Sequence, residues 1–190
     1  MTLLQPPPGE IACRAWTGEW GERHVLVVAA LRPHSYVPRG RGGRGFGENR
    51  AAAARYNAWR RTTREQLTVA LRQAKIRPFP EGVILGVSIS GGMSPAVHPG
   101  GRNRMSVWHY DPSDLHKAVE DACTGLVWHN DRQNRAALSC VWADDTADWW
   151  SVAAWGPGTD GSLRVRHAAW LGDEAVLGPT RADWLPQVHP

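Results

Sequence analysis

Aspartate is absent from the first 110 of the 190 residues, and lysine occurs only twice in the whole chain. The longest apolar stretch near the start, residues 25–31, is far shorter than the roughly 20 residues that a membrane-spanning helix needs. The first ten residues lack the basic start and apolar run of a signal peptide. The three cysteines have no CxxC spacing, which argues against a zinc ribbon or a disulfide framework. We therefore expect a cytoplasmic, reducing setting and no membrane partner.

The formal charge of +4 is unevenly distributed along the chain. Residues 1–77 hold 13 arginines and one lysine against five glutamates, which gives +9, whereas residues 105–190 hold 6 basic and 12 acidic residues, which gives −6. A basic part suits phosphates and an acidic part suits a cation, the combination that a metal-dependent nuclease needs. A GC-rich genome explains arginine in place of lysine, but it does not explain this separation of charge.

Hydrophobic periodicity predicts a single α+β domain with a mixed sheet and two main helices packed on it. We expect residues 1–10 to form a disordered leader, residues 11–157 the folded domain, and residues 158–190 a C-terminal extension of unknown role. The expected helices are 51–75 and 112–124. The expected strands are 11–16, 25–31, 83–90, 136–142 and 149–155, the last two forming a hairpin.

Residues 111–133 indicate function more strongly than any other segment. On a helix from 112 to 124, Asp111, Asp114, Lys117 and Asp121 follow one another at steps of three and four, so they lie on one strip. Another strip of the same helix is apolar and is expected to pack on the sheet. Its residues are Leu115, Ala118, Val119, Ala122 and Leu126.

A further acid, Asp131, is expected to return to the start of this helix beside Asp111. Gly125 tolerates the left-handed conformation that ends a helix, and residues 126–131, if extended, run back about 20 Å at roughly 3.3 Å per residue. Two carboxylates about 4 Å apart repel by roughly 4 kcal/mol at an effective dielectric near 20. A divalent cation would turn this repulsion into attraction.

A purely structural interpretation of the same acids is also open. Asp111 makes a good N-cap and Pro112 a good first helical residue, and Asp114 in the first turn suits the helix dipole. Asp121 is four residues after Lys117 and can serve simply as its ion-pair partner. Only the complete pattern, with Asp131 included, favours a functional site.

The segment resembles the signature of the RusA-type Holliday-junction resolvases, which are metal-dependent DNA endonucleases common in phages and prophages. The family pattern is D-x-D-N-x-x-K, an aspartate four residues later, then a paired D-D followed by x-Q. Asp111, Lys117, Asp121 and Asp131 match the first acid, the lysine, the helical aspartate and the second member of the pair. Gln133 matches the final glutamine.

This resemblance implies a crossover junction endodeoxyribonuclease that resolves four-way junctions of double-stranded DNA. Its catalytic residues would be Asp111, Lys117 and Asp131. Mg²⁺ would be held by Asp111 and Asp131, with help from Asp114, and would activate the attacking water. Because a four-way junction has near two-fold symmetry, the resemblance also implies a homodimer.

Three positions depart from the family pattern. Ser113 stands where the second acid is expected, Asp114 where the asparagine is expected, and Asn130 in place of the first paired aspartate. A shift of one residue turns a helical side chain by about 100°, so Asp114 does not replace the missing acid automatically. The main alternative is therefore a degenerate family member that binds branched DNA without cutting it. A phage protein-interaction module unrelated to DNA is a third possibility.

The loop 32–50 is rich in arginine, glycine and proline. Gly40, Gly42 and Gly45 formally satisfy G-x-G-x-x-G, but Pro33 and Pro38 separate them from the preceding strand, which argues against a dinucleotide site. Arginines on such a tether suit phosphate contact, although a solvated loop of low complexity is the plain alternative. Two tryptophans beside the signature, Trp108 and Trp128, are candidates for stacking on an unpaired base. The expected DNA-binding residues are Arg32, Arg39, Arg41, Arg44, Arg102 and Arg104.

Overall fold

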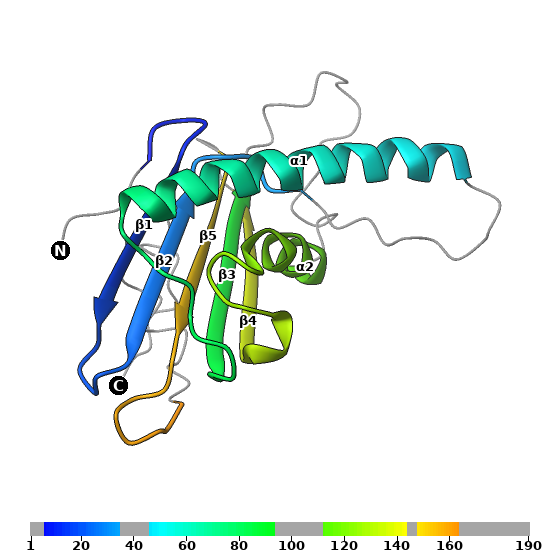
Figure 1. The fold of residues 1–190 in the computed structure, drawn as a ribbon. Coiled ribbons are helices and arrows are strands. Elements are labelled where there is room, and N and C mark those ends of the chain that lie inside the picture. Colours follow the sequence, from blue (N-terminus) through cyan, green and yellow to red (C-terminus); the bar gives the residue numbers. More distant parts are fainter. Residues whose placement is uncertain (1–5, 35–45, 94–111, 144–147, 164–190) are drawn as a thin grey trace, which may run out of the picture.

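The computed structural model describes residues 6–34, 46–93, 112–143 and 148–163 of the chain. These residues form a five-stranded mixed sheet in the order β1-β2-β5-β3-β4, with two helices (Figure 1). The α+β class and the mixed sheet with two packed helices are therefore confirmed. The strands are β1 (Ile11–Thr17), β2 (Arg23–Ala29), β3 (Leu85–Met93), β4 (Asn134–Ala143) and β5 (Trp149–Trp155). The helices are α1 (Phe46–Gln73) and α2 (Pro112–Cys123), and a short 3₁₀ helix, η3, spans Asp131–Gln133.

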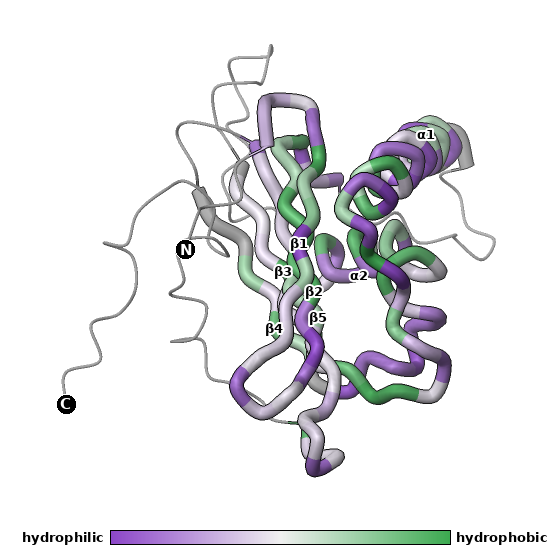
Figure 2. The backbone as a smooth tube through the Cα atoms, turned by 60° about the vertical axis from the view of Figure 1, so that its left-hand side comes forward, coloured by the Kyte–Doolittle hydropathy of each residue, from purple (hydrophilic) through white to green (hydrophobic). Residues whose placement is uncertain are grey.

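Both helices lie on the same side of the sheet, as the turned view in Figure 2 shows. The face that they cover is made of branched residues at every second strand position, the period at which side chains return to one side. Val27, Val87 and Val152 are fully buried there, together with Leu115 of α2 and Leu67 of α1. The first turns of α1 extend beyond the β4 side of the sheet (Figure 1).

The predicted hairpin of the last two strands is wrong. Both strands exist, but β3 lies between them: it pairs parallel with β4 and antiparallel with β5. All seven residues of β5 are buried, so this strand occupies a central position between β2 and β3. By contrast, β4 is an edge strand on which Leu138 is 40% exposed. Closeness in the chain favoured a hairpin, whereas burial on both faces decided the actual order.

The chain before β1 also contacts the sheet. The Gly9 amide donates a hydrogen bond to the Ala30 carbonyl (2.8 Å), and the Ala30 amide donates to the Glu10 carbonyl (3.0 Å). Residues 9 and 10 thus continue the pairing of β1 with β2, rather than belonging to the leader expected over residues 1–10. At the other end, the Thr159 amide donates to the Trp20 carbonyl (2.9 Å), which ties the beginning of the expected extension to the turn after β1.

Among the described helices, neither has the length and apolar character that crossing a membrane requires.

The position of α2 depends on a close approach at Gly91 of β3. A Cβ atom added there would lie 2.8 Å from Cδ2 of Leu115 and 3.4 Å from the carbonyl oxygen of Trp149. The missing side chain therefore makes room for Leu115, which anchors the first half of α2 on the sheet. Because Lys117 lies two residues further along α2, this contact also sets the position of the charged strip.

We expect Gly91→Val to lower the free energy of unfolding by about 1–3 kcal/mol, because the added atoms overpack a filled core. Urea denaturation measures this change. Ile84→Ala, at a position 49% exposed just before β3, serves as the control and should change stability much less. Equal stability of Gly91→Val and the wild type would show that α2 does not need this close approach.

Candidate functional site

The helix α2 presents the two faces that its sequence predicts. Leu115, Ala118, Val119 and Ala122 are all fully buried against the sheet. Gly125 follows the helix with φ of 78°, the left-handed conformation expected where the helix ends. The other side of α2 carries charged residues that meet a segment arriving from beyond the helix.

Three carboxylates surround the ammonium group of Lys117. Its Nζ atom lies 3.0 Å from Oδ1 of Asp121, 3.1 Å from Oε2 of Glu120 and 3.6 Å from Oδ2 of Asp131. An ammonium has three hydrogens to donate, so each carboxylate can take one of them. We call these four residues, Lys117, Glu120, Asp121 and Asp131, the Lys117 cluster.

Two of the three carboxylates are held on both oxygens. The hydroxyl of Tyr56, from α1, donates to Oδ2 of Asp121 at 2.8 Å. The side-chain amide of Asn134, at the start of β4, donates to Oε1 of Glu120 at 2.8 Å. Because Oδ1 of Asp121 and Oε2 of Glu120 already face Lys117, neither group has an uncommitted oxygen. Their side chains are also largely covered, with 21% and 11% exposed respectively.

Asp131 is the open carboxylate of the cluster. Its side chain is 54% exposed, and the contact with Lys117 is the longest of the three. Within the described part of the chain, its second oxygen has no hydrogen-bond or ion-pair partner. A cation or a phosphate approaching from solvent would therefore meet Asp131 and Lys117 first.

The cluster retains an excess of negative charge. Three carboxylates against one ammonium leave a formal charge of −2. Burial by itself lowers the pKa of Lys117, but its hydrogen bonds to Asp121 and Glu120 outweigh this effect and raise the pKa above its usual range. Lys117 is thus charged at every physiological pH, so it can act on a neighbouring anion but cannot serve as a base.

The neighbouring His116 does not neutralise this excess. Burial lowers the pKa of His116, the nearby Glu120 carboxylate raises it, and Lys117 lowers it, with a net shift downward. Its Nδ1 atom lies 2.6 Å from the hydroxyl of Ser139 on β4, and its Nε2 atom lies 3.9 Å from Glu120. At neutral pH the imidazole is therefore uncharged.

The chain brings Asp131 to α2 through the short helix η3. Asn130 caps this helix: its side chain accepts a hydrogen bond from the Arg132 amide at 3.1 Å. The side-chain oxygen of Gln133 completes a capping box by accepting a hydrogen bond from the Asn130 backbone amide. The side-chain nitrogen of Gln133 donates to the carbonyls of Pro80 and Val83. The predicted return of Asp131 to this helix is confirmed, but the predicted place is not: Asp131 arrives beside Lys117 in the middle of α2 and not at the start of the helix. Asp111, its expected neighbour, lies outside the described residues.

These contacts explain two positions of the signature in structural terms. Gln133 is only 5% exposed and joins the segment before β3 to η3, so it supports the position of Asp131 rather than facing a ligand. Asn130, which stands where the family has an acid, uses its side-chain oxygen as the cap. Of the side chains of Asn130, Asp131 and Gln133, the carboxylate of Asp131 is the one that stays exposed, beside Lys117.

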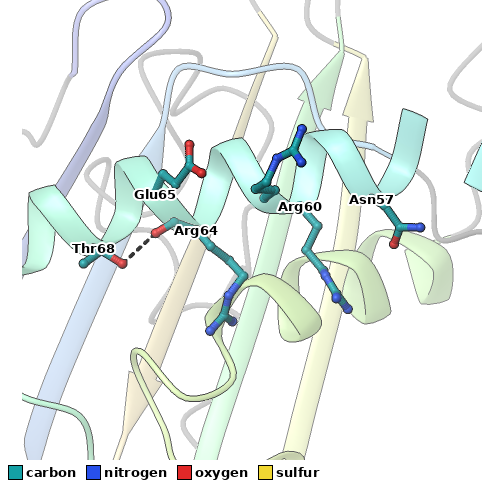
Figure 3. A pocket seen from close by; sticks show the side chains of 6 residues that line it. Asn57, Arg60, Arg64, Glu65 and Thr68 are labelled. Carbon is teal, nitrogen blue, oxygen red and sulfur yellow. Dashed lines mark hydrogen bonds between the residues drawn. The ribbon is translucent and has the colours of Figure 1, made fainter. Parts of the chain in front are cut away.

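The end of α2 is held by an arginine from the other helix. Arg64 of α1 donates from Nη1 to the carbonyls of Asp121 (3.3 Å), Ala122 (3.0 Å) and Thr124 (2.6 Å), and Figure 3 shows it reaching across to α2. The last carbonyls of a helix lack partners within it and favour a cation. Because α2 has no basic residue in its own last turn, Arg64 supplies this charge.

The other predicted site residues are only partly described. Asp114 is half-buried in the first turn of α2 and is not one of the carboxylates paired with Lys117. Arg32, after β2, is 36% exposed and pairs with Asp148 at 3.7 Å. The remaining predicted DNA-binding residues lie outside the described residues. They are Arg39, Arg41, Arg44, Arg102 and Arg104.

The proposed stacking role of Trp128 is wrong. Its side chain is fully buried, and its indole nitrogen donates to the Thr124 hydroxyl at 3.1 Å. The residue therefore closes the turn after α2 and offers no ring face to a base. Trp108, the other candidate, lies outside the described residues.

Sequence reasoning missed Glu120, Tyr56 and Arg64. A signal existed for Glu120, because it lies three residues after Lys117, a spacing that brings helical side chains together. Nothing in the sequence pairs Tyr56 or Arg64 with α2, since their partners are 57 to 65 positions away.

In the described part of the chain, no group of three or more His, Cys, Asp or Glu side chains is arranged to hold a metal ion. Lys117 takes the central position between the three carboxylates of its cluster. The donor chemistry nevertheless suits Mg²⁺, which prefers carboxylate oxygens and keeps several waters. The exposed carboxylate of Asp131 could supply one ligand to such an ion, and the excess charge of −2 would attract it.

No protein-family model matches this chain, and no curated protein matches its sequence. What can be inferred of its function therefore comes from the residues themselves.

The lowered pKa of His116 has a consequence for stability. The unfolded chain binds a proton near pH 6.5, whereas folded His116 resists protonation, so the unfolded state gains protons first as the pH falls. We expect the free energy of unfolding to decrease on acidification below about pH 6.5. In His116→Gln this decrease should be smaller. Urea denaturation at pH 7.5 and pH 5.5 measures both, and identical pH dependence in the two proteins would contradict the assignment.

Proposed function

We propose that this protein is a Mg²⁺-dependent endonuclease that cuts branched DNA. The observation that carries the proposal is the convergence of Asp131 with Glu120 and Asp121 on Lys117, within 3.0 to 3.6 Å of its Nζ atom. This convergence places an exposed carboxylate beside a permanent positive charge, in surroundings with an excess charge of −2. Metal-dependent hydrolysis of a phosphodiester can use such a pair: a ligand for the divalent cation and a positive charge for the phosphate.

Asp131 would hold Mg²⁺ together with Asp111 and Asp114. When bound, magnesium supplies an activated water and stabilises charge on the phosphate oxygens. Asp131 suits this role because it alone among the cluster's carboxylates has an oxygen free of hydrogen bonds and ion pairs within the described residues.

Lys117 would contact the phosphate. Its bonds to Glu120 and Asp121 are short and these partners are themselves fixed, so the ammonium keeps its place when Asp131 turns to another cation. The hydrogen that faced Asp131 then becomes available to a phosphate oxygen. A fixed positive charge aimed at the developing negative charge lowers the barrier without reorganisation.

The resemblance to the RusA-type resolvases extends the proposal to the substrate. It favours four-way junctions of double-stranded DNA, a homodimer with one site for each of two opposed strands, and action in the cytoplasm of a bacterial host or phage-infected cell. The separation of charge along the chain supports the nucleic-acid part of this proposal.

A protein that binds branched DNA without cutting it is the second candidate. Ser113 and Asn130 stand where the family has acids, and Asn130 uses its side-chain oxygen to cap η3. A site with fewer carboxylates would hold Mg²⁺ less strongly, while arginines would still attract the DNA backbone.

Cleavage of a synthetic four-way junction separates the two candidates. We expect the wild type to cut the junction with Mg²⁺ and not with EDTA, and Asp131→Asn to lose at least about 100-fold in rate, as loss of an electrostatic catalytic group typically does. The variant should still bind the junction, because the arginines remain. Gel analysis of end-labelled strands measures cutting, and electrophoretic mobility shift in EDTA measures binding.

Asp160→Asn is the matched control for this substitution. Oδ1 of Asp160 accepts hydrogen bonds from the amide and hydroxyl of Ser162, which an asparagine oxygen can also accept, so cutting should not change. Tight junction binding by the wild type without cutting at any Mg²⁺ concentration would favour the non-catalytic binder. Absence of junction binding would rule out both.

A further inference from the structure

The exposed side of α1 carries a run of arginines that the proposed active site does not use. From position 50 to position 64 the helix contains five arginines and no acidic residue. Three of them, Arg60, Arg61 and Arg64, line an open hollow of about 490 Å³ on this helix (Figure 3). The other lining residues are Asn57, Glu65 and Thr68.

The spacing of these residues places them in one continuous strip along α1. Positions 57, 61, 64 and 68 follow one another at steps of four, three and four, which keeps side chains on one face of a helix. The six residues that line the hollow, three arginines and one glutamate among them, carry a formal charge of +2. Such a strip attracts an anion along the helix axis.

Arg60 and Arg61 are available to an external partner. Arg64 is committed to the carbonyls at the end of α2, whereas no carboxylate or carbonyl is bound by Arg60 or Arg61 within the described residues. Arg61 is exposed and Arg60 half-exposed. A guanidinium group binds phosphate oxygens through two parallel hydrogen bonds, which makes arginine well suited to a phosphodiester.

The strip adjoins the Lys117 cluster through Asp121. Arg64, within the strip, donates to the main-chain carbonyl of Asp121, and Tyr56, which precedes Asn57 in α1, donates to the Asp121 side chain. Figure 3 shows Asn57 and Arg64 extending from α1 toward α2. A polyanion lying along α1 is thereby led to the residues proposed to act on its phosphates.

We propose that Arg60 and Arg61, in the strip that Asn57, Arg64 and Thr68 complete, bind the phosphodiester backbone of the DNA beside the cutting site. This inference rests on the proposed function, and it adds a binding surface separate from the loop arginines. Phosphate contacts of this kind position the DNA and carry no sequence information.

The test is junction binding by the double variant Arg60→Ala, Arg61→Ala, measured in EDTA over a series of salt concentrations. Each lost phosphate contact lowers the slope of log affinity against log salt by about 0.9, so we expect a reduction of about 1.8. Affinity at moderate salt should fall on the order of tenfold, equally for junctions of different sequence. Because alanine favours helix and neither arginine binds a partner among the described residues, α1 should remain folded, which circular dichroism checks.

Arg55→Ala is the matched control. Arg55 is exposed on the same helix but lies about 160° around it from Asn57, on the side away from the strip. We expect the slope of log affinity against log salt for Arg55→Ala to stay near the wild-type value. Arg60→Lys with Arg61→Lys should retain most of the slope, because the charges remain, and should lose only the paired geometry.

The outcomes separate this inference from the proposed function. If the double variant binds with the slope and affinity of Arg55→Ala while the wild type still cuts junctions, the strip is a solvated helix face and only this inference fails. If the wild type binds no junction DNA, the inference and the proposed function fail together. A lower slope for the double variant alone supports the inference, whether or not the protein cuts.

Discussion

The ion pairs of Lys117 are the interaction on which the rest of the site depends. Without the ammonium, Glu120, Asp121 and Asp131 would bring three negative charges together, and these like charges would repel one another. With it, two carboxylates become fixed supports and the third remains open to solvent. The same charge balance leaves an attraction for a further cation.

Contacts between the two helices hold this arrangement in place. Tyr56 orients Asp121, and Arg64 binds the last carbonyls of α2. The sheet contributes from below, where the absence of a side chain at Gly91 lets Leu115 seat the helix. Because α1 serves both as a clamp on α2 and as the carrier of the arginine strip, the surface proposed to bind DNA and the residues proposed to cut it share one support.

Much of the fold is visible in the sequence because it depends on local patterns. The apolar stripe of α2, its end at Gly125 and most of the strands follow from periodicity and turn chemistry. The strand order does not follow, since β4 and β5 are neighbours in the chain but are separated by β3. Of the site, Lys117, Asp121 and Asp131 were evident from spacing, whereas Tyr56 and Arg64 were not.

The sequence alone determined which residues of α2 face the core and which carry charge, because helical geometry assigns faces from spacing within a dozen positions. Tertiary structure decided which charges meet. Lys117 gains Asp131 only because η3, capped by Asn130 and tied down by Gln133, returns to the middle of the helix. Ion pairs and hydrogen bonds act over a few ångströms, and only the folded chain brings groups that are distant in sequence within that range.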